Sequence, residues 1–489
     1  MFLHAALHAA LAVLLLPPCW SLCLAMDGVK AAADEAASNN NDAVDPDPPP
    51  LRLTPLLEAG NVTGARTLAE VPALLASGCC TSYSGFLTVD KEHDSNLLFW
   101  FFRAETRPKK APLVVWLQGG PGTSMMRPVF LENGPYRLDG KSGRLERRQG
   151  TWTQRHNMLY FDNPVGTGYS FTGSPDGLSK TVGEISRSLI EALRQFFVMF
   201  PGQRTRDLYI AGESFGGKMA TALAHAIYRL PEPADPSAAF NLKGVMVING
   251  LVDVESQLDK SDIVYNLGLV DEAGRDEMKA AAAEQLRLVR EGRWLEALKL
   301  SKDECGSVVS PQETGMAGLT NYLLWNGTQD DGFSDLAQHA FIRRALHVGN
   351  TPFTARASAV AAALRDDLAV SALPMLAELA DSPVRVLVVS GQMDLCLPYR
   401  LTANFLRAMA WSGADQWASA PRVTWCVRGQ LAGYAKTVRG LTGLTHVLVR
   451  NAGHYLGQDQ PRWAANVAAT FTDGASFDTC EERCALGTV

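Results

Sequence analysis

One serine of this chain has neighbours that suit nucleophilic chemistry. The stretch Gly212-Glu213-Ser214-Phe215-Gly216 fits the pattern G-x-S-x-G. A strand-like run, DLYIA, precedes the stretch and a helix-like run, KMATALAHAIYRL, follows it, which is the setting of a nucleophile elbow. Because the pattern alone is common, a serine in an ordinary turn is the alternative. The strand before it and the helix after it favour Ser214 as a nucleophile.

A serine nucleophile needs a base to take its proton and an acid to orient that base. The chain order expected for such an elbow is serine, then acid, then histidine. Asp394 comes just after the apolar run VRVLVVSG, and His454 just after the run THVLVRNAG. His446 lies inside its strand-like run and His347 inside a helical region, so both are worse placed. We therefore predict a triad of Ser214, Asp394 and His454.

Acyl transfer also requires N–H donors for the oxyanion. The residue after the nucleophile, Phe215, should give one from its backbone. A glycine-rich loop should give another, and WLQGGPG follows a strand-like run at the right end. Because glycine lets the backbone approach a substrate closely, this loop is the candidate. A plain tight turn would explain the glycines but not their place after a core strand.

Strand-like and helix-like runs, which must hold these residues in place, alternate along the chain. Short, continuous apolar runs occur at residues 96–102, 111–119, 156–162, 206–212, 242–250, 384–391 and 445–453. Such runs are typical of strands buried on both faces, and amphipathic stretches such as residues 179–200 separate several of them. This alternation predicts an α/β fold with a central, mostly parallel sheet flanked by helices.

The domain boundaries follow from shifts in pattern. Residues 1–25 are apolar with a small-residue end, as in a signal peptide, and residues 26–50 are small, polar and proline-rich, as in a disordered propeptide or linker. We predict the two parts of the core at residues 51–250 and 381–475, a mostly helical cap insertion at residues 251–380, and a C-terminal tail at residues 476–489. A separate helical domain without a role at the site is the alternative to a cap.

Composition excludes some classes of function. A formal net charge of −6 gives no basic excess for nucleic acid, and no long apolar stretch follows the predicted signal peptide, so we expect no nucleic-acid partner and no membrane anchor. Metal-binding spacings such as Cys-x-x-Cys and His-Glu-x-x-His are absent, so we expect no metal and no cofactor.

The cysteines and sequons are consistent with the secretory pathway. Of 9 cysteines, Cys19 and Cys23 fall in the predicted signal peptide, and the odd number left means that at least one is free or pairs outside the chain. Their connectivity stays open. Sequons begin at Asn61 and Asn326, which we predict as glycosylation sites in an oxidising, glycosylating compartment.

Several long motifs in fixed order make the chain resemble the serine carboxypeptidases, which are α/β-hydrolases. The motifs are WLQGGPG, LENGPY, NMLYFDNPVGTGYS, AGESFGG, KGVMVING and NAGHYLGQDQP, spread over residues 83–471. The region with IVYNLGLVDEA, ALHVGN and LAGYAK is similar to the vitellogenic-like members. The resemblance implies release of C-terminal amino acids from peptides with a free C-terminus at acidic pH, through an acyl-enzyme on Ser214. Family members are often dimers, so a homodimer is an expected assembly.

The resemblance also implies a functional role for Glu213. Two glutamates of the family bind the substrate's terminal carboxylate, and they correspond to Glu132 and Glu213. Because two touching carboxyl groups cannot easily both ionise, they share protons and can donate to another carboxylate. By the same resemblance, Gln118 and the N–H of Gly119 complete the carboxylate site, and Trp116 supports it. Gly120 and Phe215 supply the oxyanion N–H groups.

Some positions depart from the family's usual residues. Gln118 stands in place of an asparagine, Phe215 in place of a tyrosine, and Thr123 in place of a cysteine that is paired in many members. After the histidine, Tyr455-Leu456-Gly457 replaces Met-Val-Pro, which alters the expected side-chain pockets. Two other functions stay open on this fold, an acyltransferase that uses an alcohol in place of water and a non-catalytic binding protein.

Overall fold

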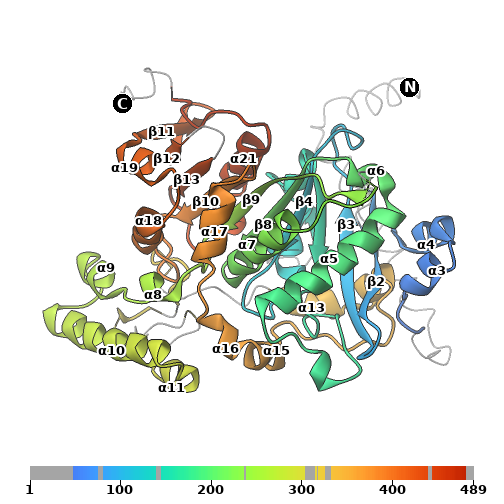
Figure 1. Ribbon diagram of the computed structural model, residues 1–489, viewed down its shortest axis with the longest axis horizontal. Coiled ribbons are helices and arrows are strands. Elements are labelled where there is room, and N and C mark those ends of the chain that lie inside the picture. Colours follow the sequence, from blue (N-terminus) through green and yellow to red (C-terminus); the bar gives the residue numbers. More distant parts are fainter. Residues whose placement is uncertain are drawn as a thin grey trace, which may run out of the picture. The chain divides into compact units, whose positions relative to one another are not determined.

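The apolar runs predicted as strands are strands of one large sheet in the computed structural model (Figure 1). The structure describes residues 48–74, 81–138, 145–235, 238–302, 305, 314–316, 318–324, 332–438 and 443–480. The predicted signal peptide, nearly all of the predicted linker, the sequon at Asn326, and Cys79, Cys80 and Cys484 lie outside these residues.

The described strands form an 11-stranded sheet. In spatial order these are β1 (Glu70–Val71), β2 (Ser82–Asp90), β3 (Ser95–Phe102), β7 (Asn157–Phe161), β4 (Leu113–Leu117), β8 (Leu208–Glu213), β9 (Leu242–Ile248), β10 (Arg385–Gly391), β13 (Leu444–Val449), β12 (Gln430–Val438) and β11 (Arg422–Val427). Strands β7, β4, β8, β9, β10 and β13 run parallel to one another. The outer strands pair antiparallel. The predicted α/β fold is confirmed, with a parallel centre and antiparallel edges.

Successive residues of the central strands enter two different hydrophobic cores, one on each face. Val115 of β4 packs with helices α5 (Val182–Met199) and α7 (Phe215–Tyr228), whereas its neighbour Val114 packs on the other face with α21 (Pro461–Thr472). This burial on both faces explains why these strands are continuously apolar in sequence.

Helix α5 shows how the sequence fixes a covering element. The side chain of Thr181 caps its start by accepting a hydrogen bond from the N–H of Glu184 at 3.2 Å. Ile185, Leu189 and Phe196 recur on one face and are buried. Each such side chain contributes about 1.5–3 kcal/mol when it leaves water. Burial of these residues, which their spacing places on one face, therefore holds α5 against the sheet.

All described elements between β9 and β10 are helices. They are α8 (Val254–Gln257), α9 (Ser261–Asn266), α10 (Glu272–Arg290), α11 (Trp294–Lys299), α13 (Phe333–Gln338), α14 (Ala340–Ala345), α15 (Ser358–Ala363), α16 (Arg365–Leu368) and α17 (Leu373–Ala380). Two groups differ in packing. Helices α13, α14 and α17 bury residues in the cores of the sheet, whereas α9, α10 and α11 bury theirs in small clusters of their own.

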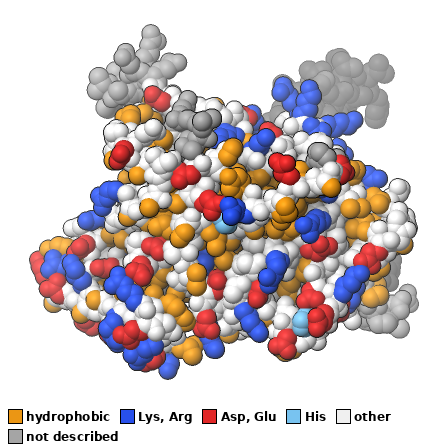
Figure 2. Space-filling model, viewed as in Figure 1, with side chains coloured by type: hydrophobic (Ala, Val, Ile, Leu, Met, Phe, Trp, Pro, Cys, Tyr) orange, Lys and Arg blue, Asp and Glu red, His pale blue; other side chains and the backbone are white. Residues whose placement is uncertain are grey.

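The exposed faces of α10 and α11 carry charges of both signs, which Figure 2 shows mixed over the part of the molecule where these helices lie in Figure 1. Arg287 bonds Glu284 and Glu291, and Arg293 bonds Glu291 and Glu296. Exposed ion pairs of this kind stabilise a helix by only about 0.3–0.5 kcal/mol each. These charges therefore mark a solvated surface.

Shorter elements complete the described chain. Two helices precede the sheet, α3 (Thr54–Glu58) and α4 (Val62–Leu68), and the others are α6 (Pro201–Arg204), α18 (Tyr399–Ala408), α19 (Ala414–Ser419) and α20 (Leu456–Asp459). A π-helical turn η1 (Pro128–Glu132), two 3₁₀ turns η2 (Trp152–Gln154) and η3 (Pro175–Gly177), and a two-stranded sheet of β5 (Tyr136–Leu138) and β6 (Leu145–Arg147) lie between them.

Two disulfides connect distant segments. Cys305 bonds Cys396, and Cys426 bonds Cys480. The first joins the helical region to the loop after β10, and the second joins β11 to the end of the described chain. Within the described residues, no helix combines the length and the apolar character that crossing a bilayer requires.

Candidate active site

Ser214 occupies a strained turn between β8 and α7. Its φ is 60° and its ψ is −129°, a backbone conformation that residues other than glycine rarely adopt. The N–H of Ser214 donates to the carbonyls of Ile248 and Asn249, each at 3.1 Å, at the end of β9. Strain of this kind persists where the surrounding structure fixes the backbone, and it is common at functional sites.

The neighbouring glycines are required by space. A Cβ at Gly212 would lie 1.9 Å from the carbonyl oxygen of Gly216, and a Cβ at Gly216 would lie 2.1 Å from that of Leu117. A Cβ at Gly119 would lie 2.6 Å from the Cβ of Ser214. The elbow and the glycine-rich loop after β4 therefore pack directly against each other.

Asp394 and His454 lie together just beyond the ends of β10 and β13. Nδ1 of His454 is 2.9 Å from Oδ2 of Asp394, and both residues are buried. The other carboxylate oxygen accepts from the N–H groups of Cys396 at 2.7 Å and Leu397 at 3.1 Å. A proton on Nδ1 that is donated to Asp394 leaves Nε2 as an acceptor, which is the state a general base needs.

Ser214 and His454 line one pocket of about 200 Å³. Among the described residues, the Ser214 hydroxyl has no hydrogen bond to the His454 imidazole, which contacts Asp394. Catalytic hydrogen bonds are often long in free enzymes and shorten when substrate binds. Ser214 and His454 thus border the same space, as a nucleophile and its general base would have to.

Asn249 organises the strand ends, and sequence reasoning did not single it out. Its amide donates to the carbonyls of Gly453 at 3.0 Å and His454 at 2.7 Å. Its side-chain oxygen accepts from the N–H of Gly391 at 2.7 Å, and its own φ is 41°. The signal was a polar residue directly after β9, inside the motif KGVMVING. Asn249 connects the loops that carry all three predicted triad residues.

The two glutamates predicted to bind a carboxylate are in contact. Glu132 ends the π-helical turn η1 and Glu213 ends β8, and their buried carboxyl groups lie close enough for each to shift the pKa of the other. The amide of Gln118 donates to Oε2 of Glu213 at 3.0 Å, and the indole N–H of Trp116 donates to Gln118 at 2.8 Å. A chain of donors thus leads from Trp116 to the carboxyl pair and fixes which way Gln118 faces.

Burial raises the pKa of both carboxyl groups. The pKa of Glu213 lies well above its usual range, first because it is buried and then because Glu132 adds a negative charge beside it. Burial likewise raises the pKa of Glu132, against the guanidinium of Arg127, which lowers it. The two therefore hold a proton between them at a pH where an exposed glutamate has lost its own.

Arg127 belongs to this cluster, although sequence reasoning missed it. Its Nε lies 3.7 Å from Oε1 of Glu132, its guanidinium stacks on Tyr455 at 3.6 Å from the ring centre, and a terminal nitrogen donates to Gln458 at 3.0 Å. The residue is buried. The signal was a lone cation in the otherwise apolar run MMRPVFL, five residues before Glu132.

The predicted oxyanion donors come from two segments next to Ser214, the start of α7 and the loop after β4. Phe215 is the first residue of α7, where N–H groups have no acceptor within the helix. Gly120 has a φ of +117° and lines the same pocket as Ser214. Both positions can present an N–H to an oxygen bound beside Ser214.

The two histidines that were worse placed in sequence, His446 and His347, have structural surroundings. His446 is buried in β13, its Nε2 lies 3.1 Å from the hydroxyl of Ser390, and burial lowers its pKa to about 3. His347 follows α14, and its Nε2 lies 3.0 Å from the carbonyl of Glu70. Neither residue lines the pocket of Ser214.

Two further features have a plain structural context. Asp394, Cys396 and His454 come close enough to suggest metal ligands, but the sulfur of Cys396 is bonded to Cys305 and offers no thiolate. Asn61 is exposed and caps α4, where its oxygen accepts from the N–H of Gly64 at 3.0 Å.

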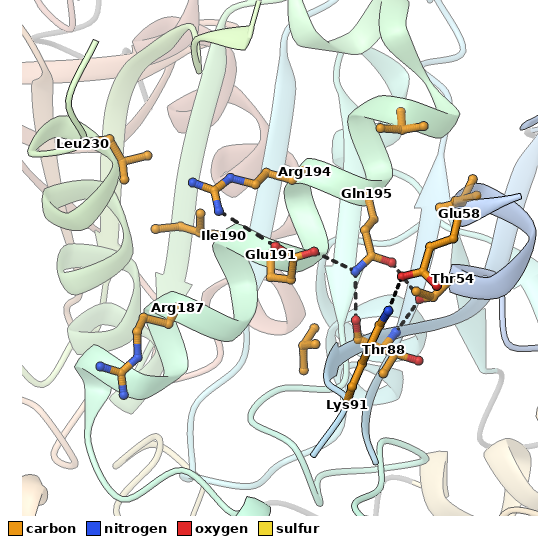
Figure 3. Close-up of a pocket in the computed structure, with 13 residues that line it drawn as sticks. Thr54, Glu58, Thr88, Lys91, Arg187, Ile190, Glu191, Arg194, Gln195 and Leu230 are labelled. Carbon is orange, nitrogen blue, oxygen red and sulfur yellow. Dashed lines mark hydrogen bonds and ion pairs between the residues drawn. The ribbon is translucent and has the colours of Figure 1, made fainter. Parts of the chain in front are cut away.

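A larger hollow lies elsewhere, against α3, β2 and α5, with a volume of about 660 Å³ (Figure 3). Its polar groups are already paired. Lys91 bonds Glu58, and Gln195 bonds Thr54, the carbonyl of Thr88 and Glu191. It contains none of the predicted site residues, so size alone does not identify the active site here.

Comparisons with known proteins agree with this geometry. The sequence model of the serine carboxypeptidase family matches residues 78–474. A venom serine carboxypeptidase of Apis mellifera is 40% identical over 88% of this chain and 92% of its own. A vitellogenic carboxypeptidase of Aedes aegypti is 37% identical, over 86% and 90%. A probable serine carboxypeptidase, CPVL, of Homo sapiens is 35% identical, over 88% and 90%.

One solved structure supports the fold independently. A prohormone-processing carboxypeptidase of Saccharomyces cerevisiae superimposes with a TM-score of 0.72 at 20% identity, over 84% of this chain and 96% of its own. At that identity the likeness bears on the fold alone. Because the family model covers most of the chain and relatives of 35–40% identity cover nearly all of it, this chain belongs to the serine carboxypeptidase family.

Proposed function

We propose that the chain releases the C-terminal residue of peptides by nucleophilic attack of Ser214. The Oγ of Ser214 forms a bond to the carbonyl carbon of the last peptide bond while Nε2 of His454 takes the hydroxyl proton. Asp394 holds the imidazole in the tautomer that allows this transfer. The C–N bond then breaks, the proton passes from His454 to the leaving amine, and an acyl-enzyme remains on Ser214.

Water completes the cycle. His454 removes a proton from water, whose oxygen attacks the acyl carbon, and the bond to Ser214 breaks as its Oγ regains a proton. The N–H groups of Gly120 and Phe215 stabilise the negative oxygen in both steps. Removal of one such donor typically reduces kcat by about 10²–10³-fold.

The contact between Glu132 and Glu213 is the observation that carries the proposal. A buried pair that retains a proton is a hydrogen-bond donor to a carboxylate, whereas the fully ionised pair would repel it. Gln118 and the N–H of Gly119 would complete the anchor, with Trp116 positioning Gln118. This anchor would hold a free peptide C-terminus one residue from Ser214 and limit activity to acidic pH.

The helical residues 251–380 act in this proposal as a cap that shapes the pocket. Thr320 and Arg356 line it, and the N–H of His454 donates to the carbonyl of Thr320 at 2.6 Å. Segment 355–357 also pairs with the loop after β4, through Thr123 and Arg356. These contacts support a role at the site over an unrelated helical domain.

Two features support maturation in the secretory pathway. The disulfides Cys305–Cys396 and Cys426–Cys480 require an oxidising compartment in most organisms. Asn61 is exposed and its sequon is therefore accessible to a glycan. We assign the mature enzyme to a secreted, lysosomal or vacuolar location.

Peptides that end in a free acid or in an amide test the anchor. We expect kcat/KM at acidic pH to be about 10²–10³-fold lower for the amide, since each hydrogen bond to a charged group contributes about 1.5–3 kcal/mol. Ser214→Ala should reduce kcat by about 10⁶-fold and abolish labelling by a fluorophosphonate. Equal rates on the two peptides would refute the carboxylate anchor, and labelling of the Ser214→Ala protein would refute the nucleophile.

A further inference from the structure

A short segment of the helical region, residues 319–322, contacts both loops that carry the predicted acid and base. Three backbone hydrogen bonds make this contact. They run from the N–H of Leu395 to the carbonyl of Leu319 at 2.9 Å, from the N–H of Tyr322 to the carbonyl of Met393 at 3.0 Å, and from the N–H of His454 to the carbonyl of Thr320 at 2.6 Å. The first two bonds lie on either side of Asp394 in sequence, and the third holds His454 itself.

The segment also packs closely against the backbone beside His454. A Cβ at Gly453 would lie 2.3 Å from the carbonyl oxygen of Thr320 and 2.6 Å from the Cβ of Asn321. A side chain at position 453 would therefore push the two backbones apart, and glycine allows their close approach. A shift of the segment would be transmitted directly to the residue before His454.

Asn321 fastens this segment through its side chain. Its Nδ2 donates to Oδ2 of Asp459 at 2.9 Å, and the same oxygen accepts from the N–H of Gly453 at 2.6 Å. Asp459 is the last residue of α20, and Asn321 is only 9% exposed. One carboxyl oxygen thus joins the helical region to the backbone next to His454.

The backbone of Gly453 and His454 is held from two sides. Asn249, at the end of β9, donates to both of their carbonyls. Their two N–H groups are held by Asp459 and by the carbonyl of Thr320. The sheet therefore fixes one half of this backbone, and the other half depends on α20 and the segment that Asn321 fastens.

We propose that Asn321 and Asp459 are positioning residues, which hold His454 where it can take the proton of Ser214. The helical region then completes the catalytic geometry in addition to shaping the pocket. A misplacement of about 1 Å at a reacting group can cost about 10²-fold in rate. Neither residue is among the described residues that line the pocket, so we expect an effect on kcat and not on KM. This inference rests on the mechanism proposed above and adds the residues that position its base.

Two truncations test the inference. Asn321→Ala removes the donor and Asp459→Ala removes the acceptor, and each should lower kcat on a free-acid peptide about 10-fold, as the loss of a hydrogen bond gives. KM should change by less than about 2-fold, because the loss is confined to the reacting state. Labelling of Ser214 by a fluorophosphonate should slow by the same factor as kcat, since it needs the base but no C-terminal carboxylate.

Two further variants separate positioning from general stability. Asp459→Asn keeps an acceptor oxygen and should restore kcat to within about 3-fold of wild type. The double variant Asn321→Ala/Asp459→Ala should lose no more than Asp459→Ala alone, because the two side chains act through one contact. Urea unfolding of each variant establishes that rates are measured on folded protein.

An equivalent pair at the opposite edge of the sheet is the matched control. Asn241 donates to Asp207 at 3.1 Å, where the two residues precede β9 and β8. Asn241→Ala should leave kcat and labelling unchanged. Should Asp459→Ala fail to fold, Asn321→Ala decides, because it leaves the bond of Gly453 in place.

Wild-type kcat and labelling in folded Asn321→Ala would overturn the inference, and so would losses that simply add in the double variant. Neither result touches the proposed activity. That activity fails if free-acid and amide peptides are cleaved alike or if the Ser214→Ala protein is labelled.

Discussion

Two buried charge clusters flank Ser214 along the chain, and they differ in balance. On one side, Glu213 contacts Glu132, with Arg127 nearby. On the other, Lys218 of α7 lies 3.3 Å from Asp367 of α16 and also contacts two backbone carbonyls of that helix, those of Asp367 and Leu368. The first cluster contains two acids for one cation, whereas the second contains one of each.

This difference in charge balance distinguishes a cluster that can take part in the reaction from one that stabilises the fold. In a matched pair, ion pairing and hydrogen bonds offset the loss of hydration. In the carboxyl cluster the second acid has no matching cation, and a proton takes that place. Buried charged groups thus occur in both clusters. Only the cluster with more acids than cations is expected to contain a group that titrates in the pH range where the enzyme works.

Breaking the matched pair gives the largest expected effect on stability. Lys218→Met would leave Asp367 buried without its cation and should lower the free energy of unfolding by about 3–5 kcal/mol. The double variant Lys218→Met/Asp367→Leu removes both charges and should recover most of this loss. Urea unfolding monitored by fluorescence measures both values. A double variant as unstable as the single one would show that the pair is not balanced.

Replacing one acid of the other cluster should change activity more than stability. Glu213→Gln has the shape of the protonated acid, and its amide donates a hydrogen bond at any pH without first taking up a proton. It should therefore keep activity on free-acid peptides within about 10-fold at acidic pH. It should also extend that activity to higher pH. Glu213→Ala removes the donor and should reduce kcat/KM by about 10–100-fold at every pH, equivalent to a charged hydrogen bond.

The measurement is kcat/KM for one free-acid peptide across pH 4–8. If kcat/KM falls at the same high pH in wild type and in Glu213→Gln, loss of the shared proton is not the cause of that fall. Lys218→Arg retains the charge of the matched pair and should leave the pH of that fall unchanged.

The sequence predicted those parts of the site that follow directly from strands. Ser214, Asp394 and His454 each lie just after an apolar run, and parallel strands bring such ends to one edge of the sheet. Gly212 of the elbow was predictable for a similar reason, because its crowding against Gly216 arises within one strand–turn–helix unit, whereas Gly216 itself is crowded by Leu117 of β4. Local pattern is enough where the chain itself sets the geometry.

Contacts between distant segments could not be predicted in this way. Cys305 and Cys396 are 91 residues apart, and no spacing rule selects that pairing among seven cysteines. The pairing of Glu132 with Glu213 came from family resemblance, not from residue pattern. Arg127 was missed because only the fold brings Tyr455 and Gln458 to it. Helical periodicity likewise did not show that α13 and α17 pack on the sheet whereas α10 does not.

The smallest expected effect is a change in how the free energy of unfolding depends on pH, which tests the difference between the two charge clusters. The pKa of Glu213 is raised in the folded state, so its contribution to stability is present below about pH 4.5 and is lost as pH rises through the folded pKa. Over that window the free energy of unfolding should fall by up to about 1.4 kcal/mol per pH unit. Asp162, whose pKa burial raises to about 6, contributes a fall of the same sign.

The difference between two proteins therefore isolates the carboxyl pair. Urea unfolding of wild type and Glu213→Gln at several values between pH 4.5 and 8 should show a shallower fall for the variant, because Asp162 titrates in both. The double variant Lys218→Met/Asp367→Leu should retain the wild-type slope, since its matched charges hold no shared proton. A Glu213→Gln slope equal to that of wild type would mean that the pair is already fully ionised or fully protonated throughout this range, and the two clusters would then differ in composition but not in their response to pH.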